Sequence, residues 1–158
     1  MKKLFLAGFV ATAVMTALMY AAPMMGMPKM DIATMLGTMF LASSGPAFWF
    51  GMMIHLMMGA LLFPAIYRFT LQPDSGSGTR RGALLGLILW AAANLMVMPM
   101  MGAIHPMVKS GMMPAPGFLM LNLGLMAPIG SLIGHLLYGA LLGKLAGRKA
   151  VGLQLQAA

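Results

Sequence analysis

The sequence contains no cysteine and only two acidic residues, Asp31 and Asp74. Without thiols the chain can form no disulfide, no iron–sulfur cluster and no thiolate metal site. Two acids also leave no pair of carboxylates for general acid–base catalysis. The chain shows no nucleophile–base arrangement and no glycine-rich phosphate loop. We therefore expect a protein that is not an enzyme.

Charged residues are scarce as well, at 8% of 158 residues, whereas 61% are hydrophobic. A soluble domain carries about 25% charged residues, so this chain has too few to cover a surface that faces water. Lipid is the expected solvent for most of it. The formal net charge is +8. Its basic residues stand in short groups beside apolar runs, which is typical of membrane topology signals rather than of nucleic-acid binding.

Four apolar segments have the length, about 20 residues, that a helix needs to cross a bilayer. They run over about residues 4–22, 48–67, 82–98 and 126–142. Pro23 and Pro99 are expected to end the first and third spans, and Pro64 to kink the second or mark its last turn. The sequence predicts an all-α fold, a transmembrane four-helix bundle, in a single membrane domain over residues 1–158.

The basic residues predict the direction of the spans. Eight of the ten flank the spans on one side: Lys2, Lys3, Arg68, Arg80, Arg81, Lys144, Arg148 and Lys149. Lys29 and Lys109 fall on the other side. The positive-inside rule then predicts a bacterial inner-membrane protein with both termini, and the tail 147–158, in the cytoplasm. The first segment also looks like a secretory signal peptide, but an internal repeat gives it a partner, so we expect it to be retained.

Two short sequences recur in the same order in both halves of the chain. The stretch HLMMGALL at 55–62 returns as HLLYGALL at 135–142, and PMMG stands at 23–26 and again at 99–102. Each half is a helix, an outer loop and a helix, so both halves have the same orientation and are related by a pseudo-twofold axis along the membrane normal. We predict two parallel-repeat helical hairpins, over about residues 1–70 and 80–146.

Four segments carry a resemblance to other proteins: PMMGMPKMDIATMLG at 23–37, WFGMMIHLMMG at 49–59, VMPMMG at 97–102 and GSLIGHLLYGALLG at 130–143. These segments carry a resemblance, which covers the whole chain, to a family of small, uncharacterised bacterial four-helix integral membrane proteins. The resemblance implies a four-span bundle and implies no activity.

His55 and His135 are expected near mid-membrane, where an ionisable side chain is costly and usually functional. Gly59 and Gly139 follow them by four residues, which places each glycine on the same helix face as its histidine. The missing side chain either lets another helix approach closely or leaves room for a flat cofactor beside the imidazole.

Three interpretations of these histidines stay open. In the first, each forms a hydrogen bond with a polar residue of the bundle, for which the candidates are Thr12, Thr16, Asn94, Asn122 and Ser131. In the second, His55 and His135 are the axial ligands of a b-type haem between the helices, with Lys29 and Lys109 near its propionates. In the third, they join methionines in a metal or proton path.

The 22 methionines are densest in the outer run 23–40. Thioethers and imidazole suit Cu(I), so Met24, Met27, Met30 and His105 form a candidate copper site. Methionine is also a flexible apolar filler, and many methionines lie mid-span without a ligand pattern.

Asp31 precedes a segment in which Ile32, Met35, Leu36 and Met39 fall on one face at helical spacing. We expect Asp31 to be the N-cap of a short helix at the outer interface; the alternative is an entry point for a cation or proton.

The sequence thus favours a non-enzymatic integral inner-membrane protein, an accessory or binding subunit. Its expected partners are lipid and either a larger membrane complex or further copies of itself, without nucleic acid. One alternative is a b-type haem electron-transfer protein, and another is a small transporter or Cu(I)-handling protein. The sequence names no cofactor: haem b and Cu(I) are both candidates.

Overall fold

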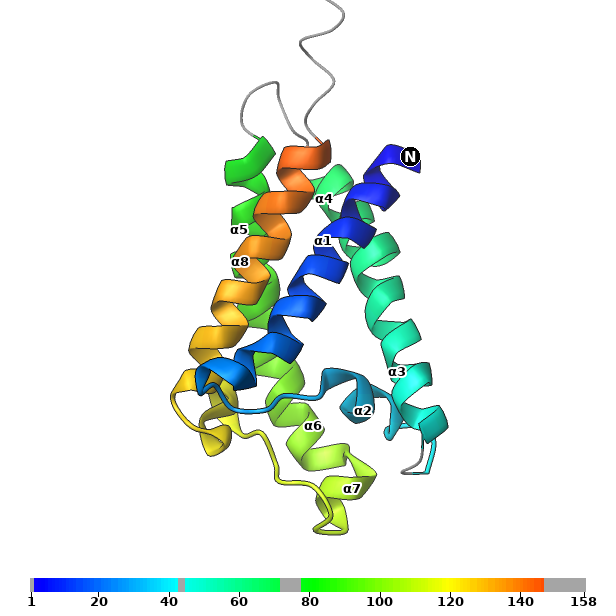
Figure 1. Cartoon of the computed structure of the whole chain (residues 1–158), viewed down its shortest axis with the longest axis vertical. Helices are drawn as coiled ribbons and strands as arrows, with labels where there is room; N and C mark the ends of the chain where they lie inside the picture. Colours follow the sequence, from blue (N-terminus) through cyan, green and yellow to red (C-terminus); the bar gives the residue numbers. More distant parts are fainter. Residues whose placement is uncertain (1, 43–44, 72–77, 147–158) are drawn as a thin grey trace, which may run out of the picture.

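The computed structural model describes residues 2–42, 45–71 and 78–146, which form helices and the connections between them (Figure 1). Within these residues, four helical stretches are long and apolar enough to cross a membrane: Lys2–Met25, Gly45–Thr70, Gly78–Ile104 and Met126–Ala146. The predicted all-α architecture with four candidate spans is confirmed for this part of the chain. The predicted tail 147–158 and Asp74 lie outside the described residues.

The first span consists of α1 (Lys2–Ala21) and a 3-10 turn, η1 (Ala22–Met25). The second joins α3 (Gly45–Met57), η2 (Met58–Leu62) and α4 (Phe63–Thr70). The third joins α5 (Gly78–Ala92), η3 (Ala93–Val97) and α6 (Met98–Ile104). The fourth is α8 (Met126–Ala146). Shorter helices between the spans are α2 (Ile32–Gly37), α7 (Pro106–Lys109) and the 3-10 segment η4 (Phe118–Leu123).

A π-helical turn stands shortly before Pro64 in the second span and shortly before Pro99 in the third. In η2 the N–H of Phe63 donates to the carbonyl of Met58, five residues back, and Pro64 follows. In η3 the N–H of Met98 donates to the carbonyl of Ala93, and Pro99 follows. Proline lacks an N–H and its ring crowds the carbonyl four residues earlier, so a wider turn gives the ring room.

The prediction that Pro99 ends the third span is therefore wrong, because the helix continues through the widened turn to Ile104. Pro64 likewise lies inside a continuous span, which runs on to Thr70. Pro23 behaves as expected, since α1 ends at Ala21 and only a 3-10 turn follows.

Helices α5 and α8 lie side by side because glycines let their backbones touch (Figure 1). A Cβ atom added to Gly139 would overlap the carbonyl oxygen of Gly82, and one added to Gly82 would overlap that of Gly139. Small residues at a crossing are the usual means by which membrane helices approach closely. The space beside Gly139 is thus filled by α5.

The first hairpin has a similar crossing between α1 and η2. A Cβ atom on Gly59 would overlap the side chain of Thr12, and one on Gly8 would lie 2.7 Å from the carbonyl oxygen of Gly59. Both glycines that follow a membrane histidine therefore lie where two helices cross. The π turns, however, fall in the second and third spans, which the proposed repeat does not pair. The parallel repeat stays a prediction.

Helix α2 closes one end of the bundle, between α3 and α6 (Figure 1). Asp31 caps it, as predicted: its carboxylate accepts hydrogen bonds from the backbone N–H of Thr34 at 2.9 Å and from the hydroxyl of Tyr20 at 3.2 Å. The apolar face of α2 is turned into the protein, where buried Met35 belongs to a cluster with Met98, Met101 and Met120.

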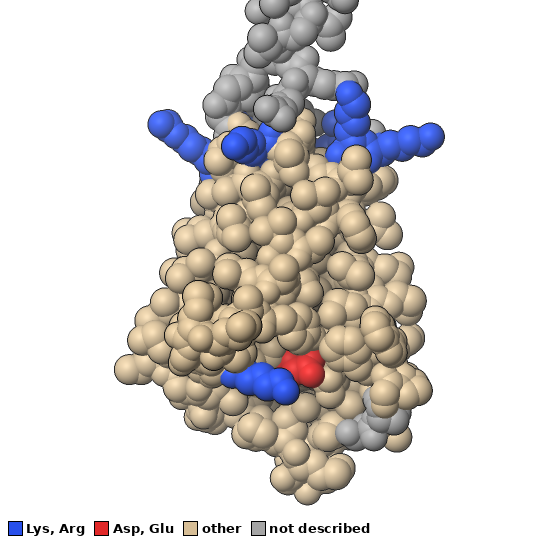
Figure 2. Space-filling model, viewed as in Figure 1, with Lys and Arg blue, Asp and Glu red and all other residues tan. Residues whose placement is uncertain are grey.

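Basic side chains gather at the end of the molecule where α1 begins and α8 ends (Figure 2). The elements at that end carry Lys2, Lys3, Arg68, Arg80, Arg81 and Lys144. Lys29 and Lys109 belong to the connections at the α2 end. The positive-inside rule predicts orientation from such an unequal distribution of basic residues. The orientation in the membrane stays a prediction.

Candidate functional site

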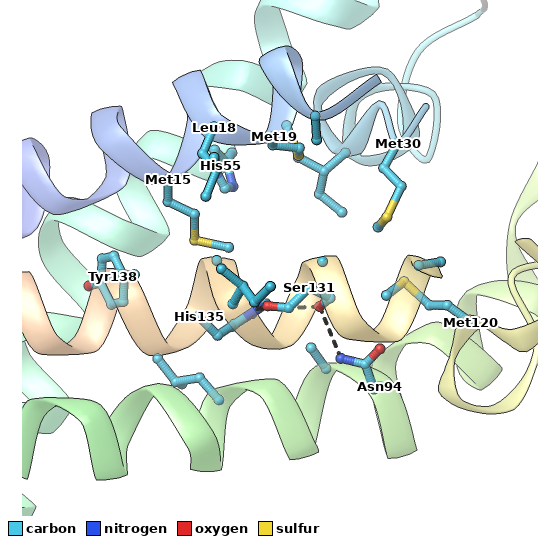
Figure 3. A pocket seen from close by; sticks show the side chains of 18 of the residues that line it. Met15, Leu18, Met19, Met30, His55, Asn94, Met120, Ser131, His135 and Tyr138 are labelled. Atoms are coloured by element: carbon cyan, nitrogen blue, oxygen red, sulfur yellow. Dashed lines mark hydrogen bonds between the residues drawn. The ribbon is translucent and has the colours of Figure 1, made fainter. Parts of the chain in front are cut away.

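A cavity of about 470 Å³ lies inside the bundle (Figure 3). Residues of all four spans line it, and residues of α2 and η4 line its α2 end. We call it the central cavity. Pockets that hold small molecules have volumes of about 300–1,000 Å³, so the central cavity has the size of a ligand site. The two π turns contribute Gly59 and Asn94 to its wall, and π turns are frequent at functional sites.

The wall of the central cavity is largely apolar and includes nine methionines. No lysine, arginine, aspartate or glutamate contributes to it in the described part of the chain. The polar residues that line it are Thr12, His55, Asn94, Ser131, His135 and Tyr138. The chemistry of this space therefore depends on a few neutral polar groups and two imidazoles.

The hydrogen bonds around His55 assign its tautomer. The hydroxyl of Thr16 lies 2.8 Å from the carbonyl of Thr12 and 3.0 Å from Nε2 of His55. A hydroxyl has one hydrogen and a carbonyl can only accept, so Thr16 donates to Thr12 and accepts from the Nε2–H of His55. In the neutral ring the free lone pair is then on Nδ1.

His135 has the opposite tautomer. Its Nδ1 lies 2.8 Å from the carbonyl oxygen of Ser131, which can only accept, so Nδ1 carries the hydrogen. The free lone pair of the neutral ring is then on Nε2. Figure 3 shows the two imidazoles on facing walls of the central cavity. The structure thus brings the two predicted site histidines to one space.

The two free nitrogens are accessible. Among the described residues, Asn94 Oδ1 is the one fully buried side-chain nitrogen or oxygen that lacks a hydrogen-bond partner. His55 Nδ1 and His135 Nε2 also lack a hydrogen-bond partner within residues 2–42, 45–71 and 78–146. Unlike Asn94 Oδ1, these two nitrogens are not fully buried. Both side chains line the central cavity, which is the space where these lone pairs could meet a ligand.

Asn94 is completely buried. Its Nδ2 donates to the carbonyl of Trp90 at 2.9 Å and to the hydroxyl of Ser131 at 3.2 Å (Figure 3). The carbonyl of Trp90 can only accept, which fixes the orientation of the amide. A buried amide oxygen without a partner costs about 1–3 kcal/mol. Asn94 lines the cavity, but this unsatisfied oxygen is sealed inside the protein. The sequence suggests Asn94 as a hydrogen-bond partner of a membrane histidine, whereas its partners are Trp90 and Ser131 instead.

Of the other predicted hydrogen-bond partners, Thr12 bonds within its own helix, to the carbonyl of Gly8 at 2.7 Å. Asn122 donates to the carbonyl of Ala115 at 3.1 Å and does not line the cavity.

The haem interpretation can be compared with this donor set. An iron between the imidazoles would use His55 Nδ1 and His135 Nε2, because the other nitrogens already donate. No cationic side chain of the described residues lines the cavity to neutralise propionates, and neither Lys29 nor Lys109 reaches it. The described residues could therefore supply two imidazole ligands to the iron, but those that line the cavity offer no cation to the propionates of a haem.

The four residues of the candidate copper site are not brought together. Met27 and Met30 line the central cavity, whereas Met24 is 89% exposed and lies outside it. His105 is fully buried and both its nitrogens are used: Nδ1 accepts from the N–H of Met107 at 3.2 Å, and Nε2 donates to the carbonyl of Met35 at 2.9 Å. Through these two hydrogen bonds, His105 links α2 to the junction between α6 and α7.

Sequence reasoning missed the segment that closes the α2 end of the cavity. In η4, Leu119 and Met120 have positive φ angles of 53° and 58°, a left-handed conformation that non-glycine residues rarely adopt. Met120 is buried and lines the cavity. Gly117 and Gly124 on either side, also with positive φ, were the signal in the sequence for an irregular turn.

Comparison with known proteins gives a family. The model of DUF6789, a family of unknown function, matches residues 2–152, so the chain belongs to that family. Neither the curated proteins nor the solved structures gave a match. The expected membership of an uncharacterised family is confirmed, and the bacterial origin stays a prediction.

Proposed function

We propose that this member of family DUF6789 is a non-enzymatic integral membrane protein that binds a lipophilic small molecule in the central cavity. The observation that carries the proposal is a ligand-sized space, about 470 Å³, in a bundle whose helices otherwise pack backbone to backbone. The size of this space and its largely apolar wall are those of a site that takes up an apolar molecule.

The polar groups favour a specific ligand over a lipid tail. A hydrocarbon chain offers no hydrogen-bond donor to the accessible nitrogens of His55 and His135. Polar groups that are buried without partners are costly. A molecule with a few polar groups on an apolar body would meet both parts of the wall, which is the usual composition of a small-molecule site.

In this proposal the protein lies in the bacterial inner membrane with both termini in the cytoplasm, because most of its basic residues stand at one end of the spans. It acts as an accessory or binding subunit, with further membrane proteins or copies of itself as partners. Short connections leave the helix faces as the surfaces through which such a protein would dock.

A b-type haem is the second candidate, because two imidazoles with free nitrogens face one cavity. The missing cation for the propionates makes it the weaker one. The two candidates differ in colour: a reduced-minus-oxidised absorption spectrum of the gently purified protein shows haem bands only in the second case. Under our proposal the protein is free of them.

The direct test is native mass spectrometry of the protein purified from its own membrane. We expect the wild type to carry one small hydrophobic molecule. Gly134→Phe should release it, because Gly134 lines the cavity and an added Cβ would meet only the side chain of Met15, at 3.5 Å, so the ring can enter the space. Met53→Phe is the control, since Met53 is 47% exposed on α3. A wild type without any such molecule, or a Gly134→Phe variant that retains it fully, contradicts the proposal.

A further inference from the structure

We infer that the central cavity selects a neutral hydroxylated aromatic molecule, a phenol or hydroquinone, over the matching ether or ketone. This inference rests on the proposed function and names the chemical class of the ligand.

The first step is that the imidazoles present acceptors. The N–H of His55 is used by Thr16 and the N–H of His135 by the Ser131 carbonyl. The lone pairs left for a ligand are on His55 Nδ1 and His135 Nε2. Neither neutral ring can donate to a ligand unless a bond within the protein is broken, so the ligand must supply the hydrogen.

The second step concerns the other polar groups of the wall. The hydroxyl of Thr12 donates to Gly8 at 2.7 Å and that of Tyr138 donates to Gly59 at 2.7 Å. The amide hydrogens of Asn94 are used as well, and its oxygen is fully buried. These donors are therefore already committed inside the protein.

Ser131 is the exception among the polar groups. Its Oγ accepts from Asn94 at 3.2 Å and lies 3.4 Å from Nδ1 of His135. Because that Nδ1 carries a hydrogen and cannot accept, the hydroxyl hydrogen of Ser131 meets no acceptor among the described residues. Ser131 stands one turn before His135. A ligand hydroxyl can donate to the free lone pair of His135 Nε2, whereas an ether or ketone has no hydrogen to donate and can only accept.

The third step gives the charge and the body of the ligand. With no charged side chain of the described residues in the wall, an ionic ligand would be buried without a counterion, which is strongly unfavourable. The nine methionines of the wall have polarisable thioethers, which make favourable contacts with aromatic rings. A neutral aromatic ring with a hydroxyl group satisfies both conditions.

The test uses two probes, 4-butylphenol and 4-butylanisole, in which the hydroxyl hydrogen of the phenol is replaced by a methyl group in the ether. The full chain is placed in phosphatidylcholine nanodiscs, and binding is measured by calorimetry after subtraction of the signal from empty discs. Because one hydrogen bond distinguishes the probes, we expect the phenol to bind about tenfold more tightly. His135→Phe and His55→Phe retain an aromatic ring without the lone pair. They should reduce this preference for the phenol, and Met53→Leu, at an exposed position of α3, should leave it unchanged.

The outcomes separate the inference from the proposed function. Equal affinities of the two probes, above the empty discs, would leave the function standing and overturn the donor selectivity. Binding of neither probe overturns the inference, and if no molecule co-purifies either, the proposed function fails with it. A preference that survives both histidine variants refutes the role of the imidazoles. Should those variants not fold, the probe pair on the wild type still decides.

Discussion

A single methyl group at the crossing of α5 and α8 should destabilise the protein measurably. In Gly139→Ala the new Cβ would overlap the carbonyl oxygen of Gly82 and lie 2.8 Å from the backbone nitrogen of Gly86. Neither atom can rotate away, so the helices must separate. Overpacking costs about 1–3 kcal/mol, and backbone neighbours place this case near the upper value. Alanine recovers about 1 kcal/mol of helix propensity, which leaves a net loss of about 2 kcal/mol.

The assay is thermal unfolding of the purified protein in detergent. For a chain of this size, a loss of about 2 kcal/mol lowers Tm by about 4–8 °C. Gly102→Ala in α6 is the matched control, because its Cβ would meet only the Cβ of Ala115 at an ordinary 3.5 Å. We expect its Tm to stay the same or to rise. If Gly139→Ala is as stable as the wild type while Gly102→Ala behaves as expected, the close crossing is refuted.

Three further predictions follow from single contacts. Asp31→Ala removes the cap of α2 and should cost about 1 kcal/mol, seen as faster amide exchange in α2; Asp31→Asn should restore most of the protection, and equal exchange in all three proteins would disprove the cap. His105→Leu removes the acceptor of the Met107 N–H and leaves the Met35 carbonyl only its 3.5 Å contact with the Thr38 hydroxyl, at a total cost of about 1–3 kcal/mol; an unchanged Tm would show that His105 does not hold α2 in place. Nitrogen-15 NMR of labelled histidine should find the hydrogen on Nε2 of His55 and on Nδ1 of His135; the same tautomer in both rings would contradict the assignment.

The four spans could be predicted because their signal is local: a long apolar run has few alternatives to a membrane helix. The residues at which the spans end were harder to predict. Pro99 was expected to stop the third span because proline breaks a regular helix. The π turn that accommodates it includes a backbone hydrogen bond from the Met98 N–H to the Ala93 carbonyl, and nothing in the residue types predicts that bond. Asp31 was predicted correctly because its partner, Thr34, is only three residues away.

The site was predictable only in part, for the same reason. His55 and His135 stood out as ionisable residues in apolar runs. Which nitrogen each ring offers depends on Thr16 and on the Ser131 carbonyl, and only three-dimensional contacts reveal this. His105 looked like a copper ligand from its neighbours in sequence, whereas its partner Met35 lies 70 residues away and uses the nitrogen that a metal would need. The cavity itself is a property of how the helices pack.

The central claim, that the cavity between the two histidines is a ligand site, is tested most directly by a crystal structure of the full chain with 4-iodophenol, read from the anomalous signal of iodine. We predict an iodine peak inside the central cavity, with the phenol oxygen within hydrogen-bond distance of His135 Nε2 or His55 Nδ1. Iodine confined to the lipid-facing surface of the helices, with the cavity occupied by a lipid chain or collapsed, would contradict it.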